Sequence, residues 1–212
     1  MLLLAFDTAT PAVTVALHDG QRVLAESSTV DARRHGELLA PSIAEVLAGA
    51  EPRDLTGIVV GVGPGPFTGL RVGVVTARVF GRTLGIPVHG VCTLDALARA
   101  AAGRAGQDFL AVTDARRKEL YWARYSAAGE RLDGPAVNRP DDLPPGLPLA
   151  GQAVSLYPAL GQSIWPEHPS AAVLATLAAE RLATGQDFLP PEPLYLRRPD
   201  AREPGAPKRV TP

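Results

Sequence analysis

The chain has 212 residues, of which 46% are hydrophobic and 20% are charged, and its formal net charge is −1. These proportions are typical of a globular protein, and they leave no overall field that would attract nucleic acid or an anionic membrane surface. A single cysteine, Cys92, excludes an internal disulfide and favours a reducing compartment. No apolar run reaches the length of a membrane span, so we expect a cytoplasmic protein.

The first hundred residues predict an alternation of short strands and helices. The predicted strands cover residues 2–6, 13–17, 23–28, 58–62 and 87–91. The predicted helices cover residues 36–48, 66–84 and 93–102. Pro41 must either kink the first of these helices or mark its true first turn, and Thr93 is a suitable N-cap for the third. The run at 2–6 has no basic segment, so it indicates a strand and not a signal peptide.

The opening pattern then returns after a linker at residues 103–108. An apolar strand ends in Asp114 as the first strand ends in Asp7, and an alternating strand and a glycine follow in both places. This repetition predicts a duplicated unit, although two common hairpins could also produce it. Later segments are a loop at 135–148, a short strand at 147–151, a helix at 171–184 with Val173, Leu174 and Leu177 inward, and an extended end. We expect units at 1–102 and 103–198, and a disordered proline-rich tail at 199–212.

The most unusual stretch is the turn at residues 61–71 and the helix that it begins. Pro66 suits a first helical position. Small residues recur there every four positions, at Gly65, Gly69, Gly73, Ala77, Gly81 and Gly85. Each helical glycine costs about 1 kcal/mol relative to alanine, so close packing must offset the row. The helix either docks only on its own sheet or presents a second face to a partner.

Several common chemistries are absent from the sequence. The four histidines are scattered, with no H-x-x-x-H pair, so no metal site is expected. The glycine-rich turn lacks the Lys-Ser/Thr of a Walker loop and the third glycine of a dinucleotide fingerprint. Cys92 ends an apolar strand and is better explained as a packed side chain than as a nucleophile.

One phosphate site remains open. Asp7, Thr8 and Thr10 could offer a carboxylate near a metal ion, hydroxyls and turn amides to a nucleotide phosphate. The same threonines could instead satisfy the backbone of their turn. Arg116, Arg117 and Lys118, after Asp114, are equally ambiguous, since they could grip a phosphate or simply decorate a hairpin.

Five segments carry a resemblance to a known family. They are Asp7–Thr10, His35 with Leu38-Leu-Ala-Pro41, Gly63–Arg71, Asp114–Arg117 with Glu119-Leu-Tyr121, and Pro193–Arg197. The Phe67-Thr-Gly-Leu-Arg71 run after a Gly-Pro-Gly turn is the most specific, although Pro66 replaces the more usual serine. Across nearly its whole length the sequence resembles the TsaB (YeaZ) family, the small paralogues of the TsaD enzymes of tRNA threonylcarbamoyladenosine synthesis.

The resemblance implies an α/β protein with a duplicated actin-like ATPase (ribonuclease H-like) fold and a reduced second subdomain. It implies a non-catalytic scaffold that pairs with a TsaD homologue and recruits TsaE, an ATPase. The reaction so supported is threonylcarbamoyl transfer to N6 of adenosine 37 in tRNAs reading codons that begin with A. The chain would contact tRNA indirectly, form a homodimer when alone, and need no cofactor of its own, with ATP and Mg²⁺ at the complex interface left open.

In that family the first two helices dock on TsaD as half of a four-helix bundle. The residues that would form this interface are His35, Leu39, Ile43, Leu47, Phe67, Gly69, Leu70, Gly73, Val74 and Ala77. An autonomous ATPase or small kinase of the same fold is the main alternative, and it depends on Asp7, Thr8 and Thr10. The Gly-Gly adenosine loop of such enzymes would fall near residues 150–152 and is degenerate here. A metalloprotease-like activity is a third alternative, which the missing metal ligands oppose.

Overall fold

The computed structural model describes residues 1–197 and contains two five-stranded sheets. The first sheet has the strand order β3-β2-β1-β4-β5. Its strands are β1 (Leu3–Asp7), β2 (Ala12–His18), β3 (Val23–Val30), β4 (Gly57–Gly61) and β5 (Val88–Val91). The second sheet has the order β10-β9-β6-β7-β8. Its strands are β6 (Phe109–Asp114), β7 (Leu120–Tyr125), β8 (Arg131–Asn138), β9 (Leu149–Ala150) and β10 (Ser163–Ile164).

The two sheets share one topology. In the first, β1 pairs antiparallel with β2 and parallel with β4, while in the second β6 pairs antiparallel with β7 and parallel with β9. The outer pairs, β2–β3 with β7–β8 and β4–β5 with β9–β10, correspond in the same way. The predicted duplicated, actin-like α/β fold is therefore confirmed. The second copy is reduced, since β9 and β10 have two residues each.

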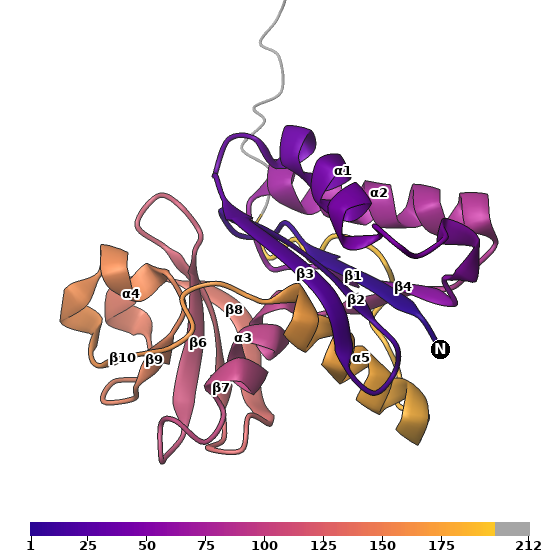
Figure 1. Ribbon diagram of the computed structural model, residues 1–212. Coiled ribbons are helices and arrows are strands. Elements are labelled where there is room, and N and C mark those ends of the chain that lie inside the picture. The colour runs from indigo at the N-terminus through magenta and orange to yellow at the C-terminus, as the bar shows by residue number, and fades with distance from the viewer. Residues whose placement is uncertain (198–212) are drawn as a thin grey trace, which may run out of the picture.

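Helices cover both faces of the first sheet (Figure 1). The helices are α1 (His35–Val46), α2 (Phe67–Leu84), α3 (Thr93–Ala101), α4 (Ala153–Leu156) and α5 (Ala171–Thr184). On one face α1 and α2 bury a core with Phe6, Val15 and Val60, and on the other α5 packs on Leu3, Ala5 and Val59. This division follows from the period of two along β1, which sends Leu4 and Phe6 to one face and Leu3 and Ala5 to the other.

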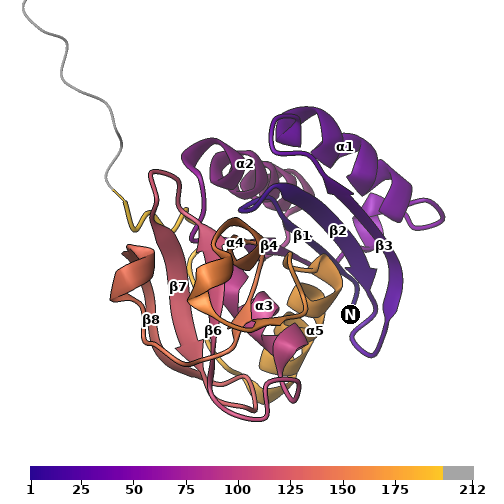
Figure 2. The same ribbon diagram turned by 90° about the vertical axis from the view of Figure 1, so that its left-hand side faces the viewer.

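The halves meet at α3, which contacts β6, β7 and β9 of the second sheet and α5 of the first (Figure 2). Helix α5 packs on the first sheet, although its residues fall within the expected second unit at 103–198. The chain returns to the first sheet because the inward face of α5 fits against β1 and β2. That face consists of Leu174, Ala175, Ala178 and Ala179, whereas the expected Val173 and Leu177 are only half-buried.

Most predicted elements are present, with a few differences. The expected loop at 135–148 begins inside β8, since Pro135 is tolerated on an edge strand. Pro41 lies inside α1, which begins at His35. Ser170 caps α5 by accepting from the amides of Ala172 and Val173. The expected disordered tail lies outside the described residues. No helix among residues 1–197 combines the length and the hydropathy needed to cross a membrane.

Candidate functional site

The turn after β1 is organised by the carboxylate of Asp7, which is fully buried. Its Oδ1 accepts from the amide of Ala9 at 2.7 Å, and its Oδ2 accepts from the hydroxyl of Thr93 at 2.6 Å. Burial raises the pKa of Asp7, and these hydrogen bonds only partly offset that effect. A side chain at Gly61 would overlap with the carboxylate. Because both oxygens have protein partners, Asp7 serves the interior of the fold and does not line the pocket beside it.

Thr93 does not cap α3 as predicted. Cys92 occupies the N-cap position, with no side-chain cap hydrogen bond. The Thr93 hydroxyl instead donates to Asp7 and accepts from the amide of Gly63 at 3.1 Å. It thus joins the start of α3 to the turns after β1 and β4. Sequence reasoning missed this contact because Thr93 lies 86 residues from Asp7.

The two threonines of the same turn both have hydrogen-bond partners within the chain. The hydroxyl of Thr8 donates to the carbonyl of Gly69 in α2 at 2.7 Å, and that of Thr10 accepts from the amide of Ala12 at 3.3 Å. A ring nitrogen of His35, Nε2, lies 2.7 Å from the carbonyl oxygen of Thr10. Thr10 thus satisfies an amide of its own turn, whereas Thr8 ties the turn to α2.

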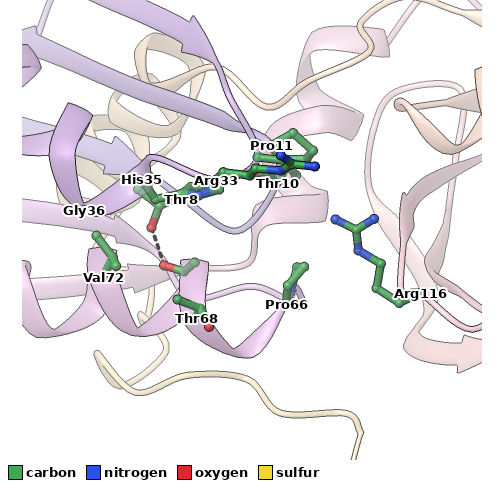
Figure 3. A pocket seen from close by; sticks show the side chains of 12 residues that line it. Thr8, Thr10, Pro11, Arg33, His35, Gly36, Pro66, Thr68, Val72 and Arg116 are labelled. Atoms are coloured by element: carbon green, nitrogen blue, oxygen red, sulfur yellow. Dashed lines mark hydrogen bonds between the residues drawn. The ribbon is translucent and has the colours of Figure 1, made fainter.

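The turn nevertheless borders a pocket of about 240 Å³ where the N-termini of α1 and α2 meet (Figure 3). Thr8, Thr10, His35, Thr68 and two arginines line it. Arg33 precedes α1, whereas Arg116 reaches in from the second half of the chain. Of the predicted nucleotide residues, Thr8 and Thr10 border this pocket and Asp7 does not. Neither Arg33 nor Thr68 was predicted as a site residue, although Thr68 lies within the Phe67-Thr-Gly-Leu-Arg71 motif.

Arg116 belongs to a turn with an unusual backbone. Arg116, Arg117 and Lys118 have φ values of 62°, 53° and 60°. Left-handed conformations cost roughly 1–2 kcal/mol per non-glycine residue, so neighbouring contacts must hold this turn. Asp114 Oδ1 accepts from the amide of Arg116 at 2.8 Å, and Arg197 donates to the carbonyl of Ala115 at 2.8 Å. These contacts stabilise the turn, and the turn places the guanidinium of Arg116 at the mouth of the pocket.

The predicted partner residues on α1 and α2 lie mostly in the core. Leu39, Leu70 and Ala77 are at most 2% exposed. The buried members of the predicted set are Leu39, Ile43, Leu47, Gly69, Leu70, Gly73, Val74 and Ala77. These eight residues are buried within the monomer, which corrects the prediction that they lie on its surface. Of the set, His35 is half-buried and Phe67 is 46% exposed.

The glycine row explains this orientation. A Cβ at Gly65 or Gly69 would overlap with the backbone oxygens of Ala9 and Thr8, respectively, and one at Gly81 would overlap with Val88. The row therefore allows α2 to approach the turn after β1 and the strand β5 within the monomer. Arg71, Arg78 and Arg82 of the same helix are exposed.

A different set of residues forms the apolar part of the solvent side of these two helices, which we call the outer face. It consists of Ala40, Pro41 and Ala44 of α1 and Val75 and Val79 of α2. The two valines are 54% and 56% exposed. They also border a groove of about 510 Å³ between α2 and β5, together with Ile86, Val88 and the arginines Arg78 and Arg82. Both helices cover the same face of the first sheet (Figure 1), and all five of these residues are exposed.

Two further chemistries were considered in the sequence, metal binding and nucleophilic attack by Cys92. Within residues 1–197, no group of three or more histidine, cysteine or acidic side chains could hold a metal ion. Cys92 is fully buried, and burial raises the pKa of its thiol to about 12. Its thiolate, the nucleophilic form, is therefore scarce at neutral pH.

Comparison with known proteins gives matches to a family model and to relatives that cover most of the chain. The family model described as TsaD, tRNA N6-adenosine threonylcarbamoyltransferase, matches residues 22–154. An uncharacterized protein of Mycobacterium tuberculosis is 49% identical over 209 residues, covering 94% of this chain and 93% of that protein. The Escherichia coli tRNA threonylcarbamoyladenosine biosynthesis protein TsaB is 30% identical over 224 residues, covering 93% of this chain and 95% of TsaB.

A solved structure supports the same assignment. YeaZ from Pseudomonas aeruginosa has a TM-score of 0.78 and 30% sequence identity, and the match covers 92% of this chain and 99% of YeaZ. Similarity thus extends over nearly the whole sequence and over both sheets. On these matches the chain belongs to the TsaB (YeaZ) family.

Proposed function

We propose that this protein takes part in tRNA threonylcarbamoyladenosine biosynthesis as a non-catalytic subunit that activates a TsaD homologue in the cytoplasm. Family membership carries the proposal, because the E. coli relative bears that biosynthetic name. The exposed apolar residues of the outer face support it, since such side chains on two adjacent helices suit helix-to-helix docking. The subunit would act by binding the competent conformation of its partner more tightly than other conformations.

The outer face is the proposed docking surface for the TsaD homologue. Val75 and Val79 would enter the partner's helix interface, and the groove beside them would receive apolar side chains in return. In the absence of a partner, a second copy of this chain could use the same surface, which would give the homodimer. TsaE would join the assembled pair, and tRNA would be contacted through the partner.

The test is the substitution Val79→Glu on the outer face. Burying a valine side chain contributes about 1.5–3 kcal/mol, and an added carboxylate opposes burial further, so we expect TsaD affinity to fall at least tenfold. Leu132→Glu on β8 is the matched control, because Leu132 is 52% exposed and Val79 is 56% exposed. Affinity is measured by calorimetry, and folding by circular dichroism. Equal affinities for the two variants would exclude the outer face as the docking surface.

The alternative, an autonomous nucleotide-binding enzyme, depends on the pocket beside Thr8 and Thr10. That pocket has a volume of about 240 Å³, slightly below the roughly 300–1,000 Å³ of small-molecule sites. Titration of the isolated chain with Mg-ATP separates the two functions. Micromolar binding with hydrolysis would favour the enzyme, whereas ATP dependence seen only in the presence of TsaD and TsaE would favour the scaffold, with nucleotide held at the complex interface.

A further inference from the structure

A second cavity, unrelated to the outer face, opens beside α5 on the opposite face of the first sheet. It has a volume of about 900 Å³ and lies between strands β2 and β3, the first turn of α5 and the segment at 165–169 that leads into α5. Ala16 of β2 packs against α5, and Val13 and Val15 pack in the core under α1 and α2. Thr14 therefore faces the α5 side, where it borders this cavity.

Two buried polar atoms at this cavity have no hydrogen-bond partner. They are the hydroxyl oxygen of Thr14 and Nδ1 of His168. The Thr14 residue is only 3% exposed, and both residues line the cavity. Buried polar atoms in folded proteins nearly always have a partner, so each such exception requires an explanation. Two of them on the wall of one cavity suggest that a ligand supplies the missing hydrogen bonds.

The charge of the wall restricts what that ligand can be. Glu26 of β3 and Glu167 line the cavity, and the lining includes no lysine or arginine. The Ser155 hydroxyl donates to Oε1 of Glu167 at 3.3 Å, which leaves Oε2 of that carboxylate without a protein hydrogen bond among the described residues. In its Nε2–H tautomer His168 also presents an acceptor, at Nδ1. The wall is therefore rich in acceptors and negatively charged.

The N-terminus of α5 does not make this negatively charged cavity a binding site for anions. The Ser170 side chain accepts from the amides of Ala172 and Val173 at 3.2 and 3.4 Å. Two of the amides that could bind a phosphate or a carboxylate are thus already used by the cap.

An aromatic side chain completes the wall. Trp165 is 60% exposed, and the guanidinium of Arg104 lies 4.8 Å from the centre of its ring. The indole thus already binds a cation on one face, and much of its surface remains open to a ligand. Aromatic rings beside carboxylates are favourable surroundings for organic cations.

We infer that this cavity binds an organic cation, a guanidinium or alkylammonium group, through Glu26, Glu167, Thr14 and His168. The N–H donors of the cation would pair with the two carboxylates and the two unpartnered acceptors, and its aliphatic part would lie along Trp165. A free amine and a basic side chain of a peptide share this chemistry. The site is on the opposite face of the first sheet from the outer face, so it does not depend on the docking proposal.

The experiment is a titration of the full chain with agmatine, a small guanidinium amine, followed by tryptophan fluorescence and by calorimetry. We expect a saturable response, which sodium phosphate at the same ionic strength does not produce. A peptide of residues 198–212 of this chain, which carries several arginines, is titrated in parallel. Tighter binding of the peptide than of agmatine would assign the site to a basic peptide, and weaker binding would assign it to a free amine.

Matched variants test the residues. Glu167→Gln and Glu26→Gln should each weaken agmatine binding about tenfold, because each removes a charge-assisted hydrogen bond, whereas Glu130→Gln, at an exposed residue beside β8, should leave it unchanged. Thr14→Val keeps the shape of the side chain and should also weaken binding. The absence of a saturable response to agmatine, or equal affinities for Glu167→Gln, Glu26→Gln and Glu130→Gln, would overturn the inference. Since Glu26 and Glu167 are exposed, their variants remain folded even if Thr14→Val does not.

Discussion

Asp7 shows how much one buried carboxylate contributes to this fold. Its position at the end of a strand before Thr8 was visible in the sequence, and it was compatible with either a metal-linked phosphate site or a closed turn. In the structure its oxygens accept from Ala9 and Thr93, and its carboxylate fills the space beside Gly61. The aspartate therefore links the turn after β1 to the start of α3. The partner at Thr93 lies 86 residues away, so the local sequence could not indicate it.

The pH dependence of stability should report the burial of Asp7. Burial raises its pKa above the ordinary value of 3.8, so the native state binds this proton more tightly than the unfolded state. The resulting stabilisation is full below pH 3.8 and is lost as the pH rises through the folded-state pKa. We expect the stability of wild type relative to Asp7→Asn to fall with rising pH across that window. Urea unfolding between pH 3.5 and about 8 measures it.

Asp19→Asn is the control with the opposite sign. Hydrogen bonds from the amides of Arg22 and Gln21 lower the pKa of Asp19. Its contribution is therefore present above the unfolded-state pKa and is lost as the pH falls. If the difference between wild type and Asp7→Asn were flat or grew with rising pH, Asp7 would not be the buried, destabilised carboxylate described here.

At the scale of secondary-structure elements, α2 has one face that is buried within the monomer and one face that is exposed. The four-residue spacing of its glycines correctly predicted a close approach of backbone to backbone. The sequence left open whether the chain's own sheet or a partner helix occupies that face, and the structure places the turn after β1 there, at Thr8 and Ala9. A helical period indicates which residues share a face, and it carries no information about which neighbour covers that face. The outer face, with Val75 and Val79, lies on the other side of the helix.

A pair of glycine substitutions tests this packing. Gly69→Ala would push a methyl group into the carbonyl oxygen of Thr8, which is backbone and cannot rotate away. Overpacking costs about 1–3 kcal/mol and exceeds the gain of about 1 kcal/mol in helix propensity, so we expect a net loss of unfolding free energy. Gly36→Ala in α1 meets nothing within 4 Å and should be neutral or slightly stabilising. Denaturant unfolding compares them, and a Gly69→Ala protein as stable as Gly36→Ala would refute the close packing of α2.

At the scale of the whole molecule, a buried network around Asp95 of α3 joins the two halves. Tyr125 of β7 donates to Asp95 Oδ1 at 2.8 Å, and Arg181 of α5 donates to Oδ2 at 3.3 Å. Arg131 of β8 lies 3.5 Å from Oδ1. The carboxylate of Asp95 thus has partners from two strands of the second sheet and from α5, which packs on the first sheet. The residues next to Asp95 in the sequence do not predict these partners.

Removal of this carboxylate should therefore destabilise the molecule as a whole. Asp95→Ala leaves the hydroxyl of Tyr125 and the cation of Arg181 without their partner, and such losses cost about 3–5 kcal/mol when a buried pair is broken. Arg99→Ala is the control from the same helix. It removes an ion pair to Glu180 of α5 whose side chains are 45% and 51% exposed, and exposed pairs contribute at most about 1 kcal/mol. Thermal and urea unfolding measure both variants, and similar losses for the two would contradict a central role for Asp95.

The amino-acid sequence by itself determined the type and order of most elements, the duplicated pattern around Asp7 and Asp114, and the family. These properties follow from local periodicity, turn residues and short motifs, which are written along the chain. The tertiary structure decided which face of α2 is buried, that α5 returns to the first sheet, that Thr93 bonds to Asp7, and that Thr14 and His168 share a cavity wall. Each of these depends on contacts between residues far apart in the sequence, and no local pattern specifies them.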